Sequence, residues 1–290
     1  MTRGLPSIYL DAFAEVARCR SFSGAAKVLA VTQSALSQRI RNLEEQLNLT
    51  LLLRTPGGVT LTEDGAKLLR YCQMRDSLEE ELLADLGAHP ANGLSGHLRV
   101  GAYSSVLRSV IMPALAPLLR DHNTIRFAFV QGQTHELTTM LFQGEADLIV
   151  MDSPITSEAI TSEKIGTESF VVIESSRHTS RSDVFLDNDP QDTMTETFFR
   201  AQNPPRSPPA QRRFAHDCYG IIDAVGKGLG RAIMSRHLVE NEGGIQIVPG
   251  YRTLQVPVLL HRIKRPYYSR LHENVVANLI KRAPQLLGKD

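Results

Sequence analysis

The segment from Ser21 to Leu47 constrains the fold of this chain more than any other stretch of its sequence. Ser21 and Thr32 each precede a run with helical periodicity, and a hydroxyl at that position accepts a hydrogen bond from the free amides of a helix start. Four apolar residues of the second run recur at spacings of four, three and four: Leu36, Ile40, Leu43 and Leu47. The pattern predicts two helices packed across a tight turn, with the Ala25-Ala26 pair at their close approach and Val31 in the turn.

The helix that begins after Thr32 carries polar side chains opposite its apolar stripe. This face is expected to expose amides, hydroxyls and an arginine: Gln33, Ser34, Ser37, Gln38 and Arg41. Amides and hydroxyls match the hydrogen-bonding groups on DNA base edges, and arginine matches phosphate. The pattern predicts a surface that enters a groove of double-stranded DNA. The alternative is a small helical bundle in which Arg39 and Arg41 are simply solvated.

A helix is expected before these two helices, and a hairpin after them. The preceding helix carries an apolar stripe: Leu10, Phe13, Val16 and Ala17. Two short apolar runs, Leu49 to Leu53 and Val59 to Leu61, flank the sequence TPGG at residues 55–58. Strand-like runs around a Pro/Gly turn are typical of a hairpin.

A long helix is expected to open at Thr62-Glu63-Asp64. Its apolar residues fall along one side: Leu68, Tyr71, Met74, Leu78, Leu82 and Leu86. Such a stripe on a helix between domains needs a partner, most simply the same helix of a second copy of the chain. The alternative is packing on the chain's own domain. Residues 89–96, HPANGLSG, are typical of a hinge.

Strand-like and helix-like segments alternate beyond the hinge. The expected strands are 98–103, 126–130, 148–151, 170–174, 231–234 and 254–263. The expected helices are 107–119, 136–142, 221–226 and about 268–282. This alternation indicates parallel sheets with crossover helices, here in two α/β lobes linked by crossing strands.

Charge and cysteine usage set broad limits. Residues 1–60 carry seven Lys or Arg and four acids, a net charge of +3, whereas residues 61–90 carry three bases and seven acids, a net charge of −4. A basic N-terminal segment suits DNA contact.

Cys19, Cys72 and Cys218 lack metal-ligand spacing and indicate buried or free thiols in a reducing compartment. No signal peptide and no apolar stretch of about 18 residues is visible, so we expect a cytoplasmic protein without membrane association.

The helix-turn-helix region resembles a known family. The sequence SFSGAAKVLAVTQSALSQRIRNLEEQLNLTLLLRTPGGVTLTEDG, at residues 21–65, is similar to the DNA-binding module of the LysR-type transcriptional regulators, and the likeness runs over about residues 7–90. The remaining chain agrees with that family's effector domain in length, element order and short motifs. The resemblance implies an α/β protein: an N-terminal all-α winged helix-turn-helix, a long linker helix, and a two-lobed, periplasmic-binding-protein-like α/β effector domain.

The resemblance also implies domain bounds and partners. The expected units are a DNA-binding domain at 1–61, a linker or dimerisation helix with hinge at 62–94, and an effector domain at 95–290, with lobe I at about 95–165 and 256–290 and lobe II at about 166–255. The expected partners are operator DNA, a small-molecule effector, a homodimer or homotetramer formed through residues 62–88, and RNA polymerase if the protein is an activator. No cofactor is expected.

The resemblance assigns the DNA-contacting residues as well. Major-groove reading falls on Gln33, Ser34, Ser37 and Gln38, and Arg54 matches the wing position that contacts the minor groove or the backbone. The rest of the expected set is Thr32, Arg39 and Arg41. Family members often have proline where this chain has Ser34, a difference expected to change base preference without abolishing binding.

Ligands of two-lobed α/β folds sit where strands end and helices begin. The residues at such points are Ser104, Ser105, Gln133, Thr134, Asp152, Tyr219 and Gly220. The hydroxyls of Ser104 and Ser105, with the free amides beside them, would hold a carboxylate. By the same resemblance these seven positions line the inducer site. The alternative for each serine is a helix cap.

Asp152 bears on the charge of the ligand. An acid in a cleft that already offers helix N-termini to an anion favours a ligand with an amine as well, such as an amino acid or similar zwitterion, including a basic one. Leu260-His261-Arg262 and Ser269-Arg270-Leu271 are weakly similar to the lysine/arginine-responsive branch of the family. The alternatives are that Asp152 is a surface carboxylate or pairs with Arg177.

No catalytic motif is complete in this sequence. Ser104 follows Gly101-Ala102-Tyr103 and so lacks a G-x-S-x-G setting, and the lysine of GKGLG at residues 226–230 is misplaced for a phosphate loop. His216-Asp217-Cys218 are sequence neighbours, which seldom form a triad. We therefore expect a regulator with no catalytic or metal site. The alternatives are a ligand-binding protein without DNA function and, less favoured, a cytosolic enzyme.

Overall fold

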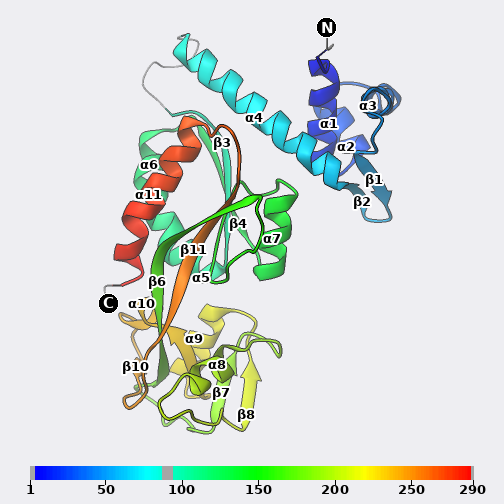
Figure 1. Cartoon of the computed structure of the whole chain (residues 1–290). Helices are drawn as coiled ribbons and strands as arrows, with labels where there is room; N and C mark the ends of the chain where they lie inside the picture. Colours follow the sequence, from blue (N-terminus) through cyan, green and yellow to red (C-terminus); the bar gives the residue numbers. More distant parts are fainter. Residues whose placement is uncertain (1–3, 87–93, 289–290) are drawn as a thin grey trace.

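The structure, a computed structural model, describes residues 4–86 and 94–288 (Figure 1). A small N-terminal head is joined by one long helix to a larger body with two lobes, and the C-terminal helix lies on the upper lobe. Most of the predicted hinge, residues 89–93, lies outside the described residues. Within the described ranges, no helix is both long and apolar enough to cross a membrane.

The head consists of α1 (Ser7–Cys19), α2 (Phe22–Val28), α3 (Gln33–Leu47), β1 (Leu52–Thr55) and β2 (Gly58–Leu61). Both predicted caps form, since Ser21 Oγ accepts from the Gly24 amide at 3.2 Å and Thr32 Oγ1 accepts from the Ala35 amide at 3.1 Å. The apolar stripes of α1 and α3 meet in one core whose buried members include Leu10, Phe13, Val16, Leu36, Ile40 and Leu43. The first hairpin strand starts at Leu52 rather than at the predicted Leu49, which is exposed.

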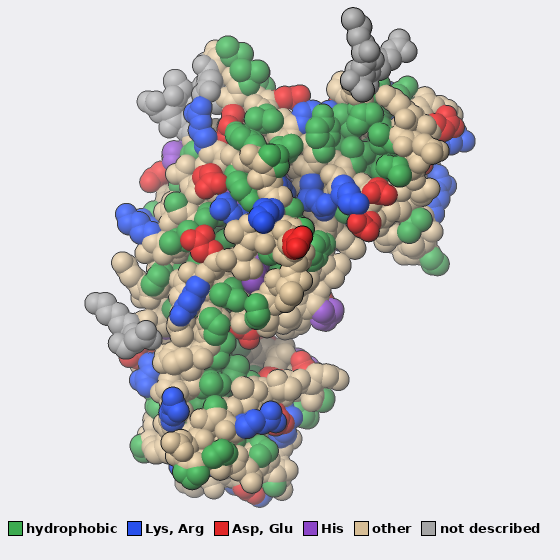
Figure 2. Space-filling model, in the orientation of Figure 1, with side chains coloured by type: hydrophobic (Ala, Val, Ile, Leu, Met, Phe, Trp, Pro, Cys, Tyr) green, Lys and Arg blue, Asp and Glu red, His purple; other side chains and the backbone are tan. Residues whose placement is uncertain are grey.

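Helix α4 (Glu63–Asp85) leaves the head and crosses the body. Its Leu69 and Cys72 are buried in the core of the head. The outer part of the predicted stripe stays exposed, with 45–72% of the surface of these residues accessible: Tyr71, Leu78, Leu82 and Leu86. Figure 2 shows hydrophobic side chains along this upper edge of the molecule, over α4 and the head. One face of α4 therefore packs on the chain's own domains while another is uncovered.

Lobe I contains the first set of strands and helices: β3 (Gly96–Ala102), α5 (Ser104–Val106), η1 (Leu107–Ile111), α6 (Met112–Asp121), β4 (Ile125–Gln131), α7 (Thr134–Phe142), β5 (Leu148–Met151) and α11 (Arg270–Leu286). Strand β3 pairs in parallel with β4 and β5, as the alternating pattern predicted. The segments α5, η1 and α6 follow one another directly, so one helical stretch covers residues 104–121.

Lobe II contains the second set: β7 (Val184–Asp187), α8 (Met194–Arg200), β8 (Gln211–Phe214), α9 (Cys218–Gly226), β9 (Arg231–Ser235), α10 (Arg236–Val239) and β10 (Ile245–Ile247). Strand β7 pairs in parallel with β8 and β9. Five of these elements were not expected from the sequence: β7, α8, β8, α10 and β10. Each spans only three to seven residues, and β8 buries none of its side chains fully, so the apolar pattern is too short or too weak.

Two long antiparallel strands, β6 (Ile160–Ser175) and β11 (Leu254–Ile263), run through both lobes. They join the parallel strands into one sheet of order β4-β3-β5-β11-β6-β9-β7-β8, with β10 paired to β6. Strand β6 begins ten residues before the predicted start at Phe170. The first half of the strand is mostly polar, so the apolar pattern did not indicate it. The predicted lobe boundaries, at 165/166 and 255/256, fall inside these two strands.

Candidate nucleic-acid interface and ligand cleft

The polar face of α3 points away from the core of the head. The exposed residues of this face are Gln33, Ser34, Gln38 and Arg41. Ser37 and Arg39 are half-buried. The Arg41 guanidinium donates to Gln38 Oε1 at 2.9 Å, and Gln38 Nε2 donates to Asn42 Oδ1 at 2.8 Å, so the amide of Gln38 is held in one orientation. Such ordering reduces the entropy lost when a side chain binds a base edge.

Thr32 and Arg54 border this face. Thr32 Oγ1 caps α3 and lies 3.0 Å from Ser34 Oγ, which makes it first of all a structural residue. Arg54 lies exposed on β1, and its Cζ is 4.6 Å from the centre of the Phe22 ring at the start of α2. A guanidinium stacked on an aromatic ring still presents its N–H groups at its edge, where a phosphate can accept them.

The head is also attached to lobe I. Arg20, which ends α1 in a left-handed conformation with φ 49°, forms an ion pair with Glu145 just after α7. The next contacts come from α4: Arg70 Nη1 donates to the Phe142 carbonyl at 2.8 Å, and Gln73 Nε2 donates to the Gly144 carbonyl at 2.9 Å. One short segment of lobe I, residues 142–145, therefore touches both the head and the linker helix.

A cleft of about 560 Å³ lies between the two lobes. Five of the seven predicted ligand-binding residues line it: Ser104, Ser105, Gln133, Thr134 and Asp152. The other two, Tyr219 and Gly220, do not line this cleft. The ring of Tyr219 lies 3.7 Å from Cζ of Arg108, and the Gly220 amide donates to Asp217 Oδ2 at 3.0 Å as part of the cap of α9. Their neighbour Cys218 lines the cleft instead, with its Sγ 3.8 Å from Ser104 Oγ.

Asp152 is held in the cleft by two donors. The Tyr103 hydroxyl donates to its Oδ1 at 3.0 Å and the Ser153 hydroxyl donates to the same atom at 2.9 Å. Asp152 is half-buried, and the side chain of Arg177 lies beside Gly244, so the described residues show no Asp152–Arg177 pair. The Tyr103 hydroxyl also lies 2.6 Å from Thr134 Oγ1 at the start of α7.

The wall of the cleft is acidic. Five acidic side chains line it: Asp152, Glu168, Asp187, Asp189 and Asp192. Among the described lining residues there is no lysine, arginine or histidine. Arg212, behind the wall, donates to Asp187 at 2.6 Å and offsets that charge. A cleft with this excess of acids attracts a ligand that carries positive charge.

The start of α7 offers fewer free amide groups to an anion than we expected from its position after a strand. The Gln133 amide already donates to Glu136 Oε2 at 2.8 Å, in a capping box. The start of the helical stretch at Ser104 keeps its hydroxyls at the cleft. A ligand carboxylate therefore has one helix start available in lobe I, not two.

Sequence reasoning missed Glu168 and the aspartates of lobe II. Glu168 sits in a polar part of β6 and reaches the cleft only because that strand crosses between the lobes. Asp189 and Asp192 belong to a loop after β7, an element that the sequence pattern did not indicate. Asp217, part of the rejected His216-Asp217-Cys218 triplet, caps α9. Over the described part of the chain, no group of three or more His, Cys, Asp or Glu side chains is arranged to hold a metal ion.

Two family models match the chain. Residues 9–66 match bacterial regulatory helix-turn-helix proteins of the lysR family, and residues 91–283 match the LysR substrate binding domain. Among curated relatives, the uncharacterized HTH-type transcriptional regulator YcgK of Bacillus subtilis is 31% identical over 55% of this chain and 49% of its own length. The HTH-type transcriptional regulator HdfR of Yersinia enterocolitica is 31% identical over 54% of this chain and 53% of its own. The chain thus spans about half the length of these relatives, which are regulators rather than enzymes.

Solved structures agree with the fold over nearly the whole chain. ArgP from Mycobacterium tuberculosis has a TM-score of 0.78 at 21% identity, covering 97% of this chain and 98% of its own. LysG from Corynebacterium glutamicum, solved with the effector Arg bound, has a TM-score of 0.71 at 18% identity, covering 96% and 98%. The predicted fold class, an N-terminal winged helix-turn-helix followed by a two-lobed α/β effector domain, is confirmed.

Proposed function

This chain belongs to the LysR family of bacterial regulatory helix-turn-helix proteins, and from that premise we propose that it is a sequence-specific DNA-binding transcription regulator whose operator binding or activation is controlled by a small-molecule effector. The observation that carries the proposal is the exposed polar face of α3 beside Arg54 on β1, in the same chain as an acidic cleft between two lobes. A DNA-contacting surface and a ligand cleft in one molecule are the two sites that effector control requires.

Operator reading is assigned to α3 and the hairpin. Gln33, Ser34, Ser37 and Gln38 would contact base edges in the major groove, because their short polar groups match the donors and acceptors found there. The phosphate-contacting set would be Thr32, Arg39, Arg41 and Arg54. Exposure supports Arg41 and Arg54 most strongly, since Arg39 is half-buried and Thr32 caps the helix.

The effector is inferred to be an amino acid or similar zwitterion, and a basic one suits the cleft best. Its carboxylate would face the hydroxyls of Ser104 and Ser105, and its amine would face Asp152. The remaining acids favour a second positive group on the ligand. The solved structure of LysG with bound Arg, which shares this fold, supports L-arginine as the first compound to test.

Control of DNA binding requires a route from the cleft to the head, and α7 offers one. Its first residue, Thr134, lines the cleft and contacts Tyr103, which donates to Asp152. Beyond its other end, the Gly144 carbonyl accepts from α4 and Glu145 pairs with Arg20 of the head. A ligand that moves the start of this nine-residue helix therefore displaces contacts of the head directly.

The proposal includes further partners and a location. A second copy of the chain would pair through the exposed stripe of α4, within residues 62–88, giving a dimer or a tetramer. RNA polymerase is a partner if the protein activates transcription, and the location is the cytoplasm. The domain bounds proposed with this function are 1–61, 62–94 and 95–290.

Footprinting on the DNA upstream of the protein's own gene, with and without L-arginine, tests the proposal. The expected result is a protected site whose extent or affinity changes with the effector. Binding of L-arginine without any sequence preference over bulk competitor DNA at low salt would instead favour a ligand-binding protein without DNA function.

A further inference from the structure

Glu168 is a buried acid at the wall of the cleft. It lies on β6 with 6% of its surface exposed. Ser235 on β9 forms a hydrogen bond with the carboxyl group of Glu168. His237 Nδ1 on α10 lies 3.9 Å from Glu168 Oε1. The Asp152 carboxylate, just after β5, repels a negative charge on Glu168. On β11 the register partner of Glu168 is the apolar Val256. None of these described neighbours is a lysine or an arginine, so none of them supplies a permanent positive charge to Glu168.

This setting disfavours the charged form of Glu168. Burial raises its pKa to about 7, the Ser235 hydroxyl acts in the opposite direction, and the Asp152 carboxylate adds to the rise. Tyr103 also faces this region, but burial raises the pKa of its hydroxyl, which stays neutral and donates to Asp152. Near neutral pH a large share of the molecules therefore carry a proton on Glu168.

A chain of short hydrogen bonds leads from Ser235 into lobe I. His237 Nδ1 is 2.7 Å from Ser235 Oγ, and His237 Nε2 is 2.8 Å from Ser109 Oγ on η1. Ser109 Oγ lies 2.7 Å from the carbonyl of Ser105, which lines the cleft. Burial lowers the pKa of His237 to about 4, so the ring is neutral at pH 7 and carries one proton.

Each hydroxyl in this chain has a single proton, so the chain can run in two directions. With Glu168 neutral, the acid donates to Ser235, Ser235 donates to Nδ1 of His237, Nε2 donates to Ser109, and Ser109 donates to the Ser105 carbonyl. With Glu168 ionised, it accepts from Ser235, Nδ1 donates to Ser235, and Ser109 donates to Nε2. This second arrangement holds one proton fewer and the other tautomer of His237: the Glu168 proton passes to Ser235, the Ser235 proton to Nδ1 and the Nε2 proton to Ser109, and the proton that Ser109 directed at the Ser105 carbonyl leaves to solvent. The Ser105 carbonyl then loses its hydroxyl donor.

We propose that Glu168 holds a proton in the effector-free protein and gives it up when a cationic group enters the cleft, with reversal of the hydrogen-bond chain between the lobes and the net release of one proton to solvent. The inference rests on the proposed function, because it requires a cationic effector. Asp152 and Glu168 interact, so a cation placed at Asp152 also stabilises ionised Glu168. Glu168 thereby determines specificity, because an uncharged ligand of the same shape gains nothing from its ionisation.

Two consequences are measurable. Below pH 7 the effector must displace a proton, so the affinity for L-arginine is expected to rise about tenfold between pH 6 and pH 8. The number of protons released per ligand is expected to be about 0.9 at pH 6, about 0.5 at pH 7 and about 0.1 at pH 8. In Glu168→Gln both dependences disappear.

The first arm of the test needs no ligand. Infrared difference spectra of the full-length protein between pH 6 and pH 8 follow the C=O stretch of a protonated carboxylic acid. We expect one such band, lost with a midpoint near pH 7, absent in Glu168→Gln and kept in Glu163→Gln. Glu163 lies on the same strand but is exposed, which makes it the matched control.

The second arm is calorimetry with L-arginine in two buffers of different ionisation enthalpy, whose difference gives the protons released. A missing band, or one that persists in Glu168→Gln, overturns the inference whatever the ligand. Binding of L-arginine without proton release, or with equal release in Glu168→Gln, overturns it and leaves the proposed function standing. A titrating band with no binding of L-arginine or L-lysine instead contradicts the cationic effector of the proposed function. If Glu168→Gln fails to fold, the pH dependence of the infrared band and of L-arginine binding in the wild type still tests the inference.

Discussion

Arg20 and Glu145, 125 positions apart in the chain, form an ion pair that ties the helix-turn-helix head to lobe I. The same Arg20 accepts a hydrogen bond on its carbonyl from the amide of Val59 in the hairpin at 2.9 Å. A single residue thus touches the wing through its backbone and the effector domain through its side chain. The orientation of the wing is therefore linked to the loop that follows α7.

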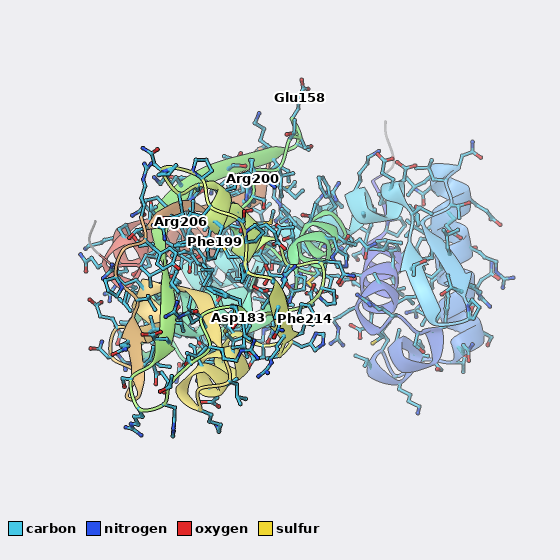
Figure 3. All side chains as sticks on the ribbon, turned by 90° about the horizontal axis from the view of Figure 1, so that it is seen from below. Glu158, Asp183, Phe199, Arg200, Arg206 and Phe214 are labelled. Atoms are coloured by element: carbon cyan, nitrogen blue, oxygen red, sulfur yellow. The ribbon has the colours of Figure 1, made fainter. Side chains whose placement is uncertain are left out.

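Breaking this pair should change the coupling between ligand and DNA more than it changes stability. Both side chains are partly exposed, at 61% and 30%, and such pairs contribute at most about 1 kcal/mol to folding. For Glu145→Gln we expect a midpoint of thermal unfolding close to that of the wild type and a reduced ratio of operator affinities with and without L-arginine, by about twofold to fivefold. Glu158→Gln, at a side chain that projects away from the body in Figure 3, is the control. If the ratio of operator affinities is unchanged in Glu145→Gln, the Arg20–Glu145 pair does not transmit the effect of the ligand to the head.

The residues that we assign to phosphate contact and those that we assign to base contact should behave differently in a salt titration of DNA binding. Arg41→Ala and Arg54→Ala are each expected to weaken binding to all duplexes and to lower the slope of log K against log salt by about one, because each removes a phosphate contact. Gln33→Ala should keep that slope and lose about 1–3 kcal/mol of discrimination at one base pair. Arg200→Ala, in lobe II and exposed (Figure 3), should leave both quantities unchanged. Identical behaviour of Gln33→Ala and Arg41→Ala would contradict the assignment.

Removing the charge of Asp152 should weaken effector binding without disturbing the cleft. Asparagine keeps the shape and the acceptor atom for Tyr103 but cannot form an ion pair with an amine. We expect Asp152→Asn to bind L-arginine about 10-fold to 100-fold more weakly in calorimetry, with the free energy of unfolding little changed. Asp183→Asn, an exposed aspartate of lobe II, is the matched control. If Asp152→Asn binds L-arginine as tightly as the wild type does, the amine of the ligand binds at another site.

A charge placed in the uncovered apolar stripe of α4 should weaken the association of two chains. Leu82 is 57% exposed on the side of α4 that is free in the single chain. If a second copy covers it, Leu82→Glu places a charge in an apolar contact and should shift the assembly towards monomers in sedimentation velocity. Leu229→Glu, at a leucine of lobe II that is 47% exposed, should sediment as the wild type does. Unchanged assembly in Leu82→Glu would favour another interface.

Features set by neighbours along the chain could be predicted, whereas those set by crossing strands could not. The caps at Ser21 and Thr32 follow from a hydroxyl before an apolar period, and both form. Glu168 lies next to His237 only because β6 packs beside the segment that follows β9, 69 positions further along the chain. The residues around Glu168 in the sequence do not indicate this contact. In lobe I, the predicted residues at the strand ends line the cleft. In lobe II the turn of α9 directs Tyr219 towards Arg108 instead.

The burial of Glu168 also predicts how stability depends on pH. Its pKa is about 7 in the folded protein against 4.5 in the unfolded chain, so the folded state binds the proton more tightly. Between pH 4.5 and pH 7 the free energy of unfolding therefore falls as pH rises, by about 3 kcal/mol from this group. Glutamine keeps the polar shape and never ionises, so Glu168→Gln should become more stable than the wild type as pH rises through this window, with the full difference present at pH 8. Urea unfolding of Glu168→Gln, Glu163→Gln and the wild type at pH 5 and pH 8 measures this, and a pH-independent difference between Glu168→Gln and the wild type would show that Glu168 is already ionised at pH 5.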